Sequence, residues 1–259
     1  AAVPNLIGEG QGIGSNSWVV SGDLTETGAP ILVNDPHHAT SAPGLWMQMG
    51  LHCRVVSSDC PFDVTGFTFA GFPGVIIGHN AELAWGLTNL GADVTDFYLE
   101  RIWGDQYWQD GKQLPLTVRE ETINVADAEP ITFDVRSTHH GPIISDQIPM
   151  LSVQTAPAPL SGGFTKYAVA LSWTALTPGT TADALLALNV ASSAADIAAA
   201  AAQLDAPAQN IIWASSDGHI GYQASGRIPV RAYPADAEIP ADGTWPQPGW
   251  DSRYDWQGF

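Results

Sequence analysis

The sequence has little positive charge. Its 259 residues include 9 Lys and Arg against 27 Asp and Glu, which gives a formal net charge of −18. A chain of this sign is repelled by phosphate backbones and anionic lipid headgroups, which argues against nucleic acid and anionic membranes as partners. Long apolar runs are also missing, so no stretch could cross a bilayer as a helix. The 45% of hydrophobic residues predicts an ordinary buried core, in one large domain or two small ones.

Cysteine is almost absent. Cys53 and Cys60 are the only two in the sequence. Their spacing suits a small disulfide-closed loop in an exported protein, and the alternative is two unrelated buried thiols. A metal site here would need further ligands, which His52 alone does not supply.

Short apolar runs separated by turn formers predict a β-rich first part. Residues 18–20 and 31–33 flank a turn-rich segment and indicate a hairpin, and two runs between residues 122 and 144 indicate another. Two Ala- and Leu-rich segments, residues 182–191 and 194–204, then predict helices. Residues 211–214 and 220–223 flank Asp217-Gly218, a strong hairpin signal. Antiparallel strands and helices in separate blocks indicate an α+β protein.

Residues 12–20, GIGSNSWVV, place Ser15 between a glycine-rich turn and an apolar run. The Gly14 carbonyl has no side chain to shield it from attack by the neighbouring hydroxyl. If the Gly14–Ser15 bond were cut, Ser15 would carry a hydroxyl nucleophile and a free amine that can act as its base. Taken alone, the segment favours a simpler interpretation, a Gly-rich turn that leads into an edge strand with Ser15 as a cap.

Further motifs follow Ser15 in order along the chain. Taken together, these segments resemble the penicillin acylase (penicillin amidase) family of N-terminal nucleophile hydrolases, from about Gly12 to the last residue. The segments are NDPH at residues 34–37, GHN at 78–80, AWG at 84–86, DVTDFYLER at 93–101 and NIIWASSDGHIGY at 210–222.

The resemblance implies part of the αββα sandwich of these hydrolases. It also implies that residues 1–14 are the end of a spacer or propeptide and that residues 15–259 are the N-terminal part of a β subunit. We expect the α subunit and the rest of the β subunit to be missing partners. Family members are usually exported precursors, and the first residues do not read as a signal peptide. We therefore expect the chain to begin inside its gene product, and the enzyme to be periplasmic or secreted.

The resemblance also implies roles for five residues. Ser15 is the nucleophile, and its α-amine, with an ordinary pKa of about 7.7–8.0, is the base. The Asn210 side chain and the Asn89 backbone N–H are the oxyanion donors. His37 positions the nucleophile, and Arg231 helps to hold the catalytic asparagine. The alternatives are a turn residue for Asn210 and a solvated loop histidine for His37.

The resemblance also implies a calcium site at Asp93, the Thr95 carbonyl and Asp96. Closely spaced oxygen ligands of this kind are those that hard cations prefer. The alternative is an acidic loop before a strand, and relatives take a further ligand from the α subunit. No organic cofactor is expected. His79-Asn80 and the pair His139-His140 lack the spacing of a zinc motif, so we interpret them as loop residues satisfied by backbone hydrogen bonds.

These observations predict an amidohydrolase that cuts a linear N-acyl amide through an acyl-ester on an autocatalytically exposed Ser15. Relatives that act on acyl-homoserine lactones or cephalosporins tend to carry histidine at the position of His37, where members of the penicillin G type have glutamine. His37 therefore favours a lactone or general acyl-amide substrate. Two alternatives stay open: a non-catalytic sandwich module, and a metal-dependent hydrolase that uses Asp93, Asp96 and the histidines.

Overall fold

The computed structural model describes residues 14–38, 41–154 and 166–259. These residues form two compact units, which we describe separately. The first contains the described residues up to Ala92 together with Pro178–Arg227, and the second contains Asp93–Thr177 and Ile228–Phe259. Most of the predicted spacer end, residues 1–14, lies outside the described residues. Within the described part of the chain, no helix is long and apolar enough to cross a membrane.

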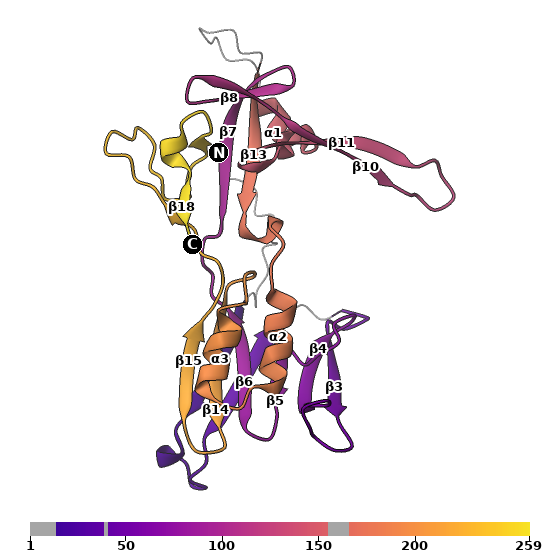
Figure 1. Cartoon of the computed structure of the whole chain (residues 1–259), viewed down its shortest axis with the longest axis vertical. Helices are drawn as coiled ribbons and strands as arrows, with labels where there is room; N and C mark the ends of the chain where they lie inside the picture. The colour runs from indigo at the N-terminus through magenta and orange to yellow at the C-terminus, as the bar shows by residue number, and fades with distance from the viewer. Residues whose placement is uncertain (1–13, 39–40, 155–165) are drawn as a thin grey trace. The chain divides into compact units, whose positions relative to one another are not determined.

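The first unit is built on a six-stranded antiparallel sheet (Figure 1). In spatial order its strands are β15 (Ile220–Ala224), β14 (Gln209–Ser215), β6 (Leu83–Asn89), β5 (Ile77–His79), β4 (Asp63–Phe69) and β3 (Trp46–His52).

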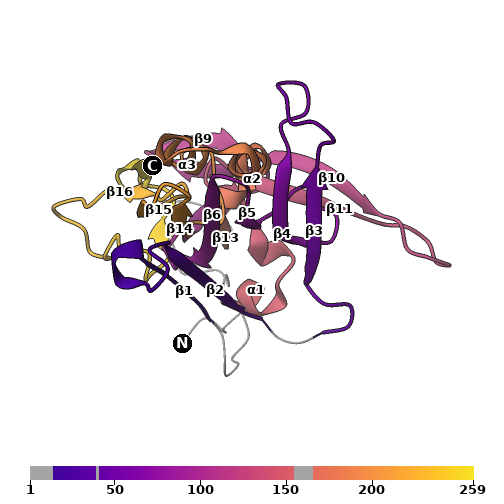
Figure 2. The ribbon, with the colours of Figure 1, turned by 90° about the horizontal axis from the view of Figure 1, so that it is seen from below.

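A hairpin and a pair of helices cover this sheet. Strands β1 (Gly14–Val20) and β2 (Ile31–His37) pair antiparallel and are joined through η1 (Gly22–Leu24), as the turn-rich segment predicts. Helices α2 (Thr181–Val190) and α3 (Ala194–Ala201) pack on the sheet at β4 and β15. Figure 2 shows the hairpin on the opposite side of β6 and β14 from the helices, which gives three layers within this unit.

The core of the first unit lies between the sheet and the helices. Leu83 and Trp85 of β6 pack there with Leu188 of α2 and Ile197 of α3. The buried Asn189 side chain accepts from the Val75 backbone N–H at 2.8 Å and donates to its carbonyl at 2.6 Å. The Asn189 amide thus joins α2 to Val75, which lies before β5 and outside any strand, and it bonds both backbone groups of that residue.

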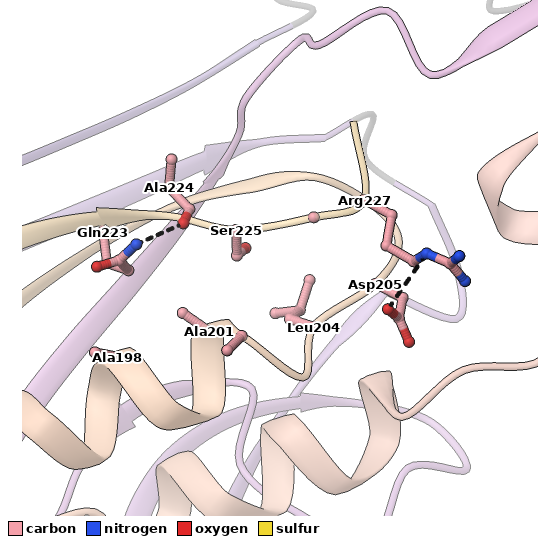
Figure 3. Close-up of a pocket in the computed structure, with 10 residues that line it drawn as sticks. Ala198, Ala201, Leu204, Asp205, Gln223, Ala224, Ser225 and Arg227 are labelled. Carbon is pink, nitrogen blue, oxygen red and sulfur yellow. Dashed lines mark hydrogen bonds and ion pairs between the residues drawn. The ribbon is translucent and has the colours of Figure 1, made fainter. Parts of the chain in front are cut away.

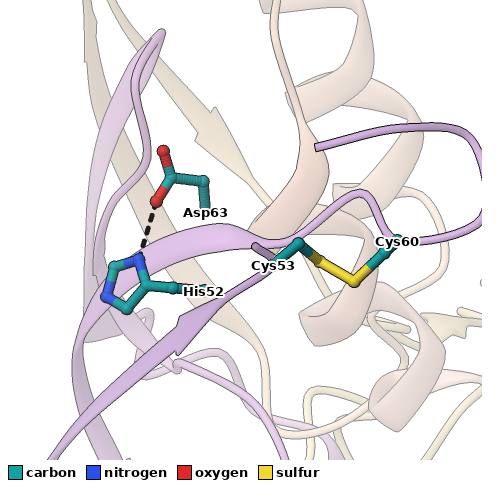
Figure 4. Close-up of a disulfide and its surroundings, with 4 residues drawn as sticks. All are labelled: His52, Cys53, Cys60 and Asp63. Atoms are coloured by element: carbon teal, nitrogen blue, oxygen red, sulfur yellow. Dashed lines mark hydrogen bonds and ion pairs between the residues drawn. A yellow bond between two sulfur atoms is a disulfide. The ribbon is translucent and has the colours of Figure 1, made fainter. Parts of the chain in front are cut away.

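The two cysteines close the turn between β3 and β4 (Figure 4). Cys53 and Cys60 are joined by a disulfide with their Cα atoms 5.9 Å apart. Next to it, the His52 Nδ1 and Asp63 Oδ1 atoms lie 2.7 Å apart across the register of the two strands. The predicted disulfide is confirmed.

The second unit contains a five-stranded sheet and two smaller ones. The larger sheet has the order β13 (Lys166–Trp173), β7 (Thr95–Trp103), β8 (Gln106–Gln109) and β9 (Lys112–Pro115), with β17 (Gln247–Pro248) parallel to β7. The smaller sheets are β10 (Thr117–Ile123), β11 (Ile131–Thr138) and β12 (Gly141–Pro142), and β16 (Val230–Arg231) with β18 (Trp256–Gly258). Short helices complete the unit: η2 (Ile144–Asp146), α1 (Pro149–Gln154), η3 (Thr174–Leu176) and η4 (Ser252–Tyr254).

Strand β7 alternates between buried and accessible residues, as a half-buried strand does. Its buried positions are Asp96, Tyr98, Glu100 and Ile102, each 1% exposed or less. Two carboxylates on the face that should be apolar require partners, because an unpaired buried charge is strongly unfavourable. The mostly antiparallel sheets with few helices confirm the α+β prediction.

Candidate active site

Ser15 lies on β1, opposite Pro36 of β2. The His37 backbone N–H donates to Ser15 Oγ at 3.3 Å. The imidazole of His37 is engaged elsewhere, since its Nε2 lies 3.0 Å from Asp35 Oδ2 and 3.4 Å from Asn16 Nδ2. The contact from His37 to the nucleophile candidate is therefore made by its backbone amide.

Asn34, to which the sequence analysis assigns no role, ties the hairpin to β6. Its side chain accepts from the Leu87 N–H at 3.1 Å and donates to the Leu87 carbonyl at 3.0 Å, and so replaces a strand partner. Its Nδ2 also lies 3.3 Å from the Asn16 carbonyl of β1. A Cβ at Gly86 would lie 2.9 Å from Asn34 Cβ, so a glycine is needed beneath this side chain. Asn34 of the NDPH motif therefore packs on Gly86 of the AWG motif. Through its bond to Asn16, Asn34 also holds β1, the strand that carries Ser15.

The backbone N–H of Asn89 points away from β14. Gln209, which stands opposite Asn89, uses both of its backbone groups to bond Ser225 on the other side. Leu90 N–H donates to the Ala208 carbonyl at 3.0 Å, which makes the Asn89–Gln209 pair a non-hydrogen-bonded one. The Asn89 N–H is consequently directed to the same edge of β6 as that of Leu87, where β5 no longer continues.

Asn210 lies on β14 opposite Thr88 and faces the hairpin side of the sheet with it. Its Nδ2 donates to Thr88 Oγ1 at 3.1 Å and to the Asn89 carbonyl at 3.2 Å. Its Oδ1 accepts from the Tyr222 hydroxyl at 2.7 Å. These contacts orient the amide with its donor end toward the end of β6. Tyr222 is a second residue to which the sequence analysis assigns no role, although it closes the motif that begins at Asn210.

A pocket of about 440 Å³ opens beside Ser15, and Asn89 also lines it. It forms where the three-residue β5 leaves the edge of β6 uncovered. Most of its wall is apolar and comes from β3, β4, β6, α2 and the segments beside them, including Trp46, Phe69, Phe72, Ile76, Leu87 and Leu185. The pocket can therefore hold an apolar group next to a serine hydroxyl and a backbone N–H that is not used in the pairing of β6 with β14.

A second pocket, of about 240 Å³, lies between α3 and β15 (Figure 3). Arg227 and Asp205 stand at one end of it, with Arg227 Nε 3.9 Å from Asp205 Oδ1. The Arg227 backbone N–H also donates to the Asp205 carbonyl at 2.8 Å. These contacts join the chain after β15 to the loop after α3, which is a structural role.

In the second unit, Arg231 is paired with Asp93 and Asp96. Its Nε donates to Asp96 Oδ2 at 2.8 Å, and its Nη2 lies 3.0 Å from Asp93 Oδ2. Burial lowers the pKa of Arg231, but the hydrogen bond and charge of Asp96 and the charge of Asp93 raise it more, so the net pKa is above its ordinary value. The predicted role of Arg231 in holding Asn210 stays a prediction.

Asp96 has a carboxylate oxygen that is available to bind a cation. Its Oδ2 accepts from Arg231 and from Trp256 Nε1, whereas its buried Oδ1 has no hydrogen-bond partner among the described residues. The Thr95 backbone N–H donates to Asp93 Oδ1 at 3.3 Å. The carboxylates of Asp93 and Asp96 therefore fit an oxygen-liganded cation, although Arg231 already neutralises part of their charge.

At His79-Asn80 the expected backbone hydrogen bonds are present, but His79 is the last residue of β5 and not a loop residue. At His139-His140 the expectation of backbone hydrogen bonds alone is wrong. His79 Nδ1 lies 3.3 Å from the Asn80 carbonyl, and the Asn80 side chain bonds backbone groups of Glu82, Leu83, Asn189 and Ala191. His140 is instead held by side-chain carboxylates, with Nδ1 2.8 Å from Glu100 and Nε2 2.9 Å from Asp255. Sequence alone does not show this, because Glu100 and Asp255 are far from it along the chain.

Comparison with known proteins identifies relatives of this chain. The acyl-homoserine lactone acylase QuiP of Pseudomonas aeruginosa is 31% identical over 249 residues, which are 95% of this chain and 27% of that protein. The penicillin G acylase of Escherichia coli is 31% identical over 251 residues, 95% of this chain and 26% of that protein. The chain thus spans about a quarter of the length of these curated relatives.

The fold agrees as well. The thermostable penicillin G acylase from Alcaligenes faecalis superposes with a TM-score of 0.72 at 25% identity, over 93% of this chain and 39% of that one. The mostly antiparallel architecture is therefore that of a penicillin acylase. Residues 2–259 of this chain match the penicillin amidase family, and the chain belongs to that family.

Proposed function

We propose that the protein is an amidohydrolase that cleaves a linear N-acyl amide through an acyl-ester on Ser15. One observation carries the proposal: Ser15 and Asn89 line the same apolar pocket, and the Asn89 N–H is turned away from its neighbouring strand β14. Asn210, with its donor end directed to the end of β6, is the second oxyanion donor. The relatives named as acylases support the reaction class.

The reaction requires a free amine on Ser15. In the precursor, the Ser15 hydroxyl attacks the Gly14 carbonyl, the peptide C–N bond breaks, and the amine takes the proton of the hydroxyl. Water then hydrolyses the resulting ester and leaves Ser15 at a new N-terminus. Gly14 has a φ of 143°, a backbone conformation that side chains oppose, so glycine is favoured at the cleavage position.

Catalysis then uses the same two groups of Ser15. The hydroxyl attacks the substrate amide carbon while the α-amine accepts its proton, and the oxyanion is held by the Asn89 N–H and the Asn210 amide. The amine returns the proton to the leaving nitrogen as the acyl-ester forms. Water, deprotonated by the same amine, attacks the ester carbonyl and the bond to Ser15 Oγ breaks. The amine returns the proton to Oγ, and a carboxylic acid is released.

The pocket determines the acyl group. Its aromatic and aliphatic wall favours an apolar acyl chain or ring over a charged one. We propose an N-acyl-homoserine lactone or a related acyl amide as the substrate, in keeping with the relatives and with His37.

Three further proposals accompany the reaction. Calcium binds at Asp93, the Thr95 carbonyl and Asp96 in a structural role. The enzyme acts in the periplasm or outside the cell. Because the chain spans about a quarter of its curated relatives, further polypeptide of the kind found in them, an α subunit and the rest of a β subunit, completes the site.

The test is intact mass after expression of the full-length protein and two variants. We expect the parent to yield a chain that begins at Ser15, and Ser15→Ala to stay uncut and inactive. Ser17→Ala changes another serine of β1 and is the matched control, which should mature normally. A Ser15→Ala protein cut at Gly14 would show that another residue or a protease makes the cut. An uncut parent would favour the non-catalytic module.

The metal-dependent alternative is tested on the processed enzyme. If the acyl-ester forms on Ser15, chelation of divalent ions leaves turnover measurable at low temperature. Immediate loss of activity that zinc restores, together with activity in Ser15→Ala, would favour a metal-dependent hydrolase.

A further inference from the structure

The second unit contains a cluster of ligating side chains outside the proposed active site. His139 and His140 follow β11, and Asp255 lies between η4 and β18. One ligand atom from each of the three lies within 4.8 Å of the others. The cluster uses neither the serine nucleophile nor the carboxylates of the expected calcium site.

His140 is held in the way that proteins hold a metal-binding histidine. Its Nδ1 lies 2.8 Å from Glu100 Oε1, and Thr138 Oγ1 donates to the same oxygen at 2.7 Å. Its ring stacks on Tyr98 with the ring centroids 3.6 Å apart. Metal-bound histidines usually donate their second ring nitrogen to a carboxylate, which fixes the ring and raises its basicity. Here the fixed ring leaves Nε2 directed at Asp255.

The spacing of the ligand atoms suits a tetrahedral ion. His140 Nε2 lies 2.9 Å from Asp255 Oδ1, and His139 Nε2 lies 3.4 Å from Asp255 Oδ2. Ligands at about 2.0–2.1 Å from a tetrahedral zinc are about 3.3 Å apart. Each imidazole nitrogen therefore lies near this spacing from one oxygen of Asp255, and all three ligand atoms lie within 4.8 Å of one another. A water can occupy the fourth position, and Gln109 Nε2, which lies 2.9 Å from His139 Nε2, is a hydrogen-bond donor beside the site and not a ligand.

The charge of the cluster favours a divalent ion. The Glu100 side chain is 0% exposed and that of His140 is 5% exposed, and Glu100 Oε2 has no partner among the described residues. A protonated His140 supplies one positive charge against the two carboxylates of Glu100 and Asp255. A divalent cation bound to neutral histidines balances both, and uncompensated buried charge is costly.

We propose that His139, His140 and Asp255 bind a divalent transition metal, and that zinc is the ion that fits these ligands best. Calcium prefers oxygen ligands, whereas zinc accepts two imidazole nitrogens with a carboxylate. Any proton on His140 Nε2 leaves to solvent as the ion binds. The bound ion joins the segment after η4 to the turn after β11, and its role is structural.

Zinc binding to the intact protein tests the proposal. The protein is freed of transition metals and kept in excess calcium. It is then titrated with zinc by calorimetry, and cobalt is used as a spectroscopic probe. We expect one tight site per chain and the visible absorption of a tetrahedral cobalt centre. His139→Ala should weaken binding at least tenfold and abolish that absorption, as should Asp255→Asn.

A matched control separates this site from weak binding to other histidines. His219 pairs with Asp217 at 2.9 Å on an exposed turn, and His219→Ala should leave the tight site unchanged. His140→Ala risks misfolding because the side chain is buried, so the test relies on His139, whose side chain is 32% exposed. The proposal is overturned if the parent binds no zinc at millimolar concentration, or if His139→Ala binds zinc as the parent does.

Discussion

Replacing Asn210 by alanine tests the oxyanion donor directly. The change removes the Nδ2 group that now lies 3.1 Å from Thr88 Oγ1 and 3.2 Å from the Asn89 carbonyl. When one of its hydrogens turns to the substrate oxyanion, the interaction is stronger in the transition state than in the bound substrate. We therefore expect turnover to fall by about 10²–10³, or about 3–4 kcal/mol, with little change in KM.

The effect of this change on folding should be much smaller. The Tyr222 side chain that loses its acceptor is 58% exposed and can turn to water. Thr88 is half-buried and Asn89 is exposed, so water can also replace the lost donor there. One such hydrogen bond contributes about 1 kcal/mol to the free energy of unfolding. Thermal unfolding of the variant should confirm that the kinetic loss is not a loss of folded protein.

The assay is steady-state hydrolysis of a chromogenic N-acyl amide. Because the same donor would assist self-cleavage, only chains shown by intact mass to begin at Ser15 are counted as enzyme. Tyr222→Phe is the matched control: it keeps the Asn210 amide and loses only the 2.7 Å bond that orients it. We expect it to lower turnover less than about tenfold. An Asn210→Ala enzyme within about threefold of the parent would refute the assignment.

Three other predictions follow from the fold. Gly86→Ala should lower the free energy of unfolding, measured by urea titration, by about 1–3 kcal/mol and should also slow turnover. The reason is that the new Cβ would lie 2.9 Å from Asn34 Cβ. An unchanged free energy of unfolding would contradict this packing. Replacing Cys53 and Cys60 by serine should lower the free energy of unfolding by about 2–3 kcal/mol without changing kcat. Equal urea midpoints for variant and parent would contradict this prediction. Chelation should lower the melting temperature and leave low-temperature turnover intact, and added calcium should restore the part of the loss that comes from the site at Asp96. A melting temperature that does not rise when calcium is added back would argue against bound calcium.

Local patterns were enough to predict much of the fold. Alternating apolar residues and turn formers predict the β1–β2, β10–β11 and β14–β15 hairpins, and Ala- and Leu-rich composition predicts both long helices. The second helix ends at Ala201 and not at residue 204, because the backbone turns at Ala202 and Gln203. Such boundaries depend on capping contacts that composition does not show.

The contacts around the site could not be predicted in the same way. Asn34 and Leu87 are 53 residues apart, and their contact exists only because β5 ends early and leaves the edge of β6 open. Tyr222 reaches Asn210 through the β14–β15 register, which a slip of one residue would destroy. The direction of the Asn89 N–H likewise follows from the pairing of β6 and β14, and no local signal specifies it.

Strand β7 explains why the second unit needs remote partners. Its alternation places Asp96 and Glu100 on the buried face with Tyr98, so both carboxylates must be neutralised by residues from elsewhere in the chain. Arg231 meets Asp96, and His140 meets Glu100. Breaking a buried ion pair by removal of one partner is strongly destabilising, about 3–5 kcal/mol, so each carboxylate depends on its partner. The acidic positions of one strand therefore mark both cation-binding regions proposed for this unit.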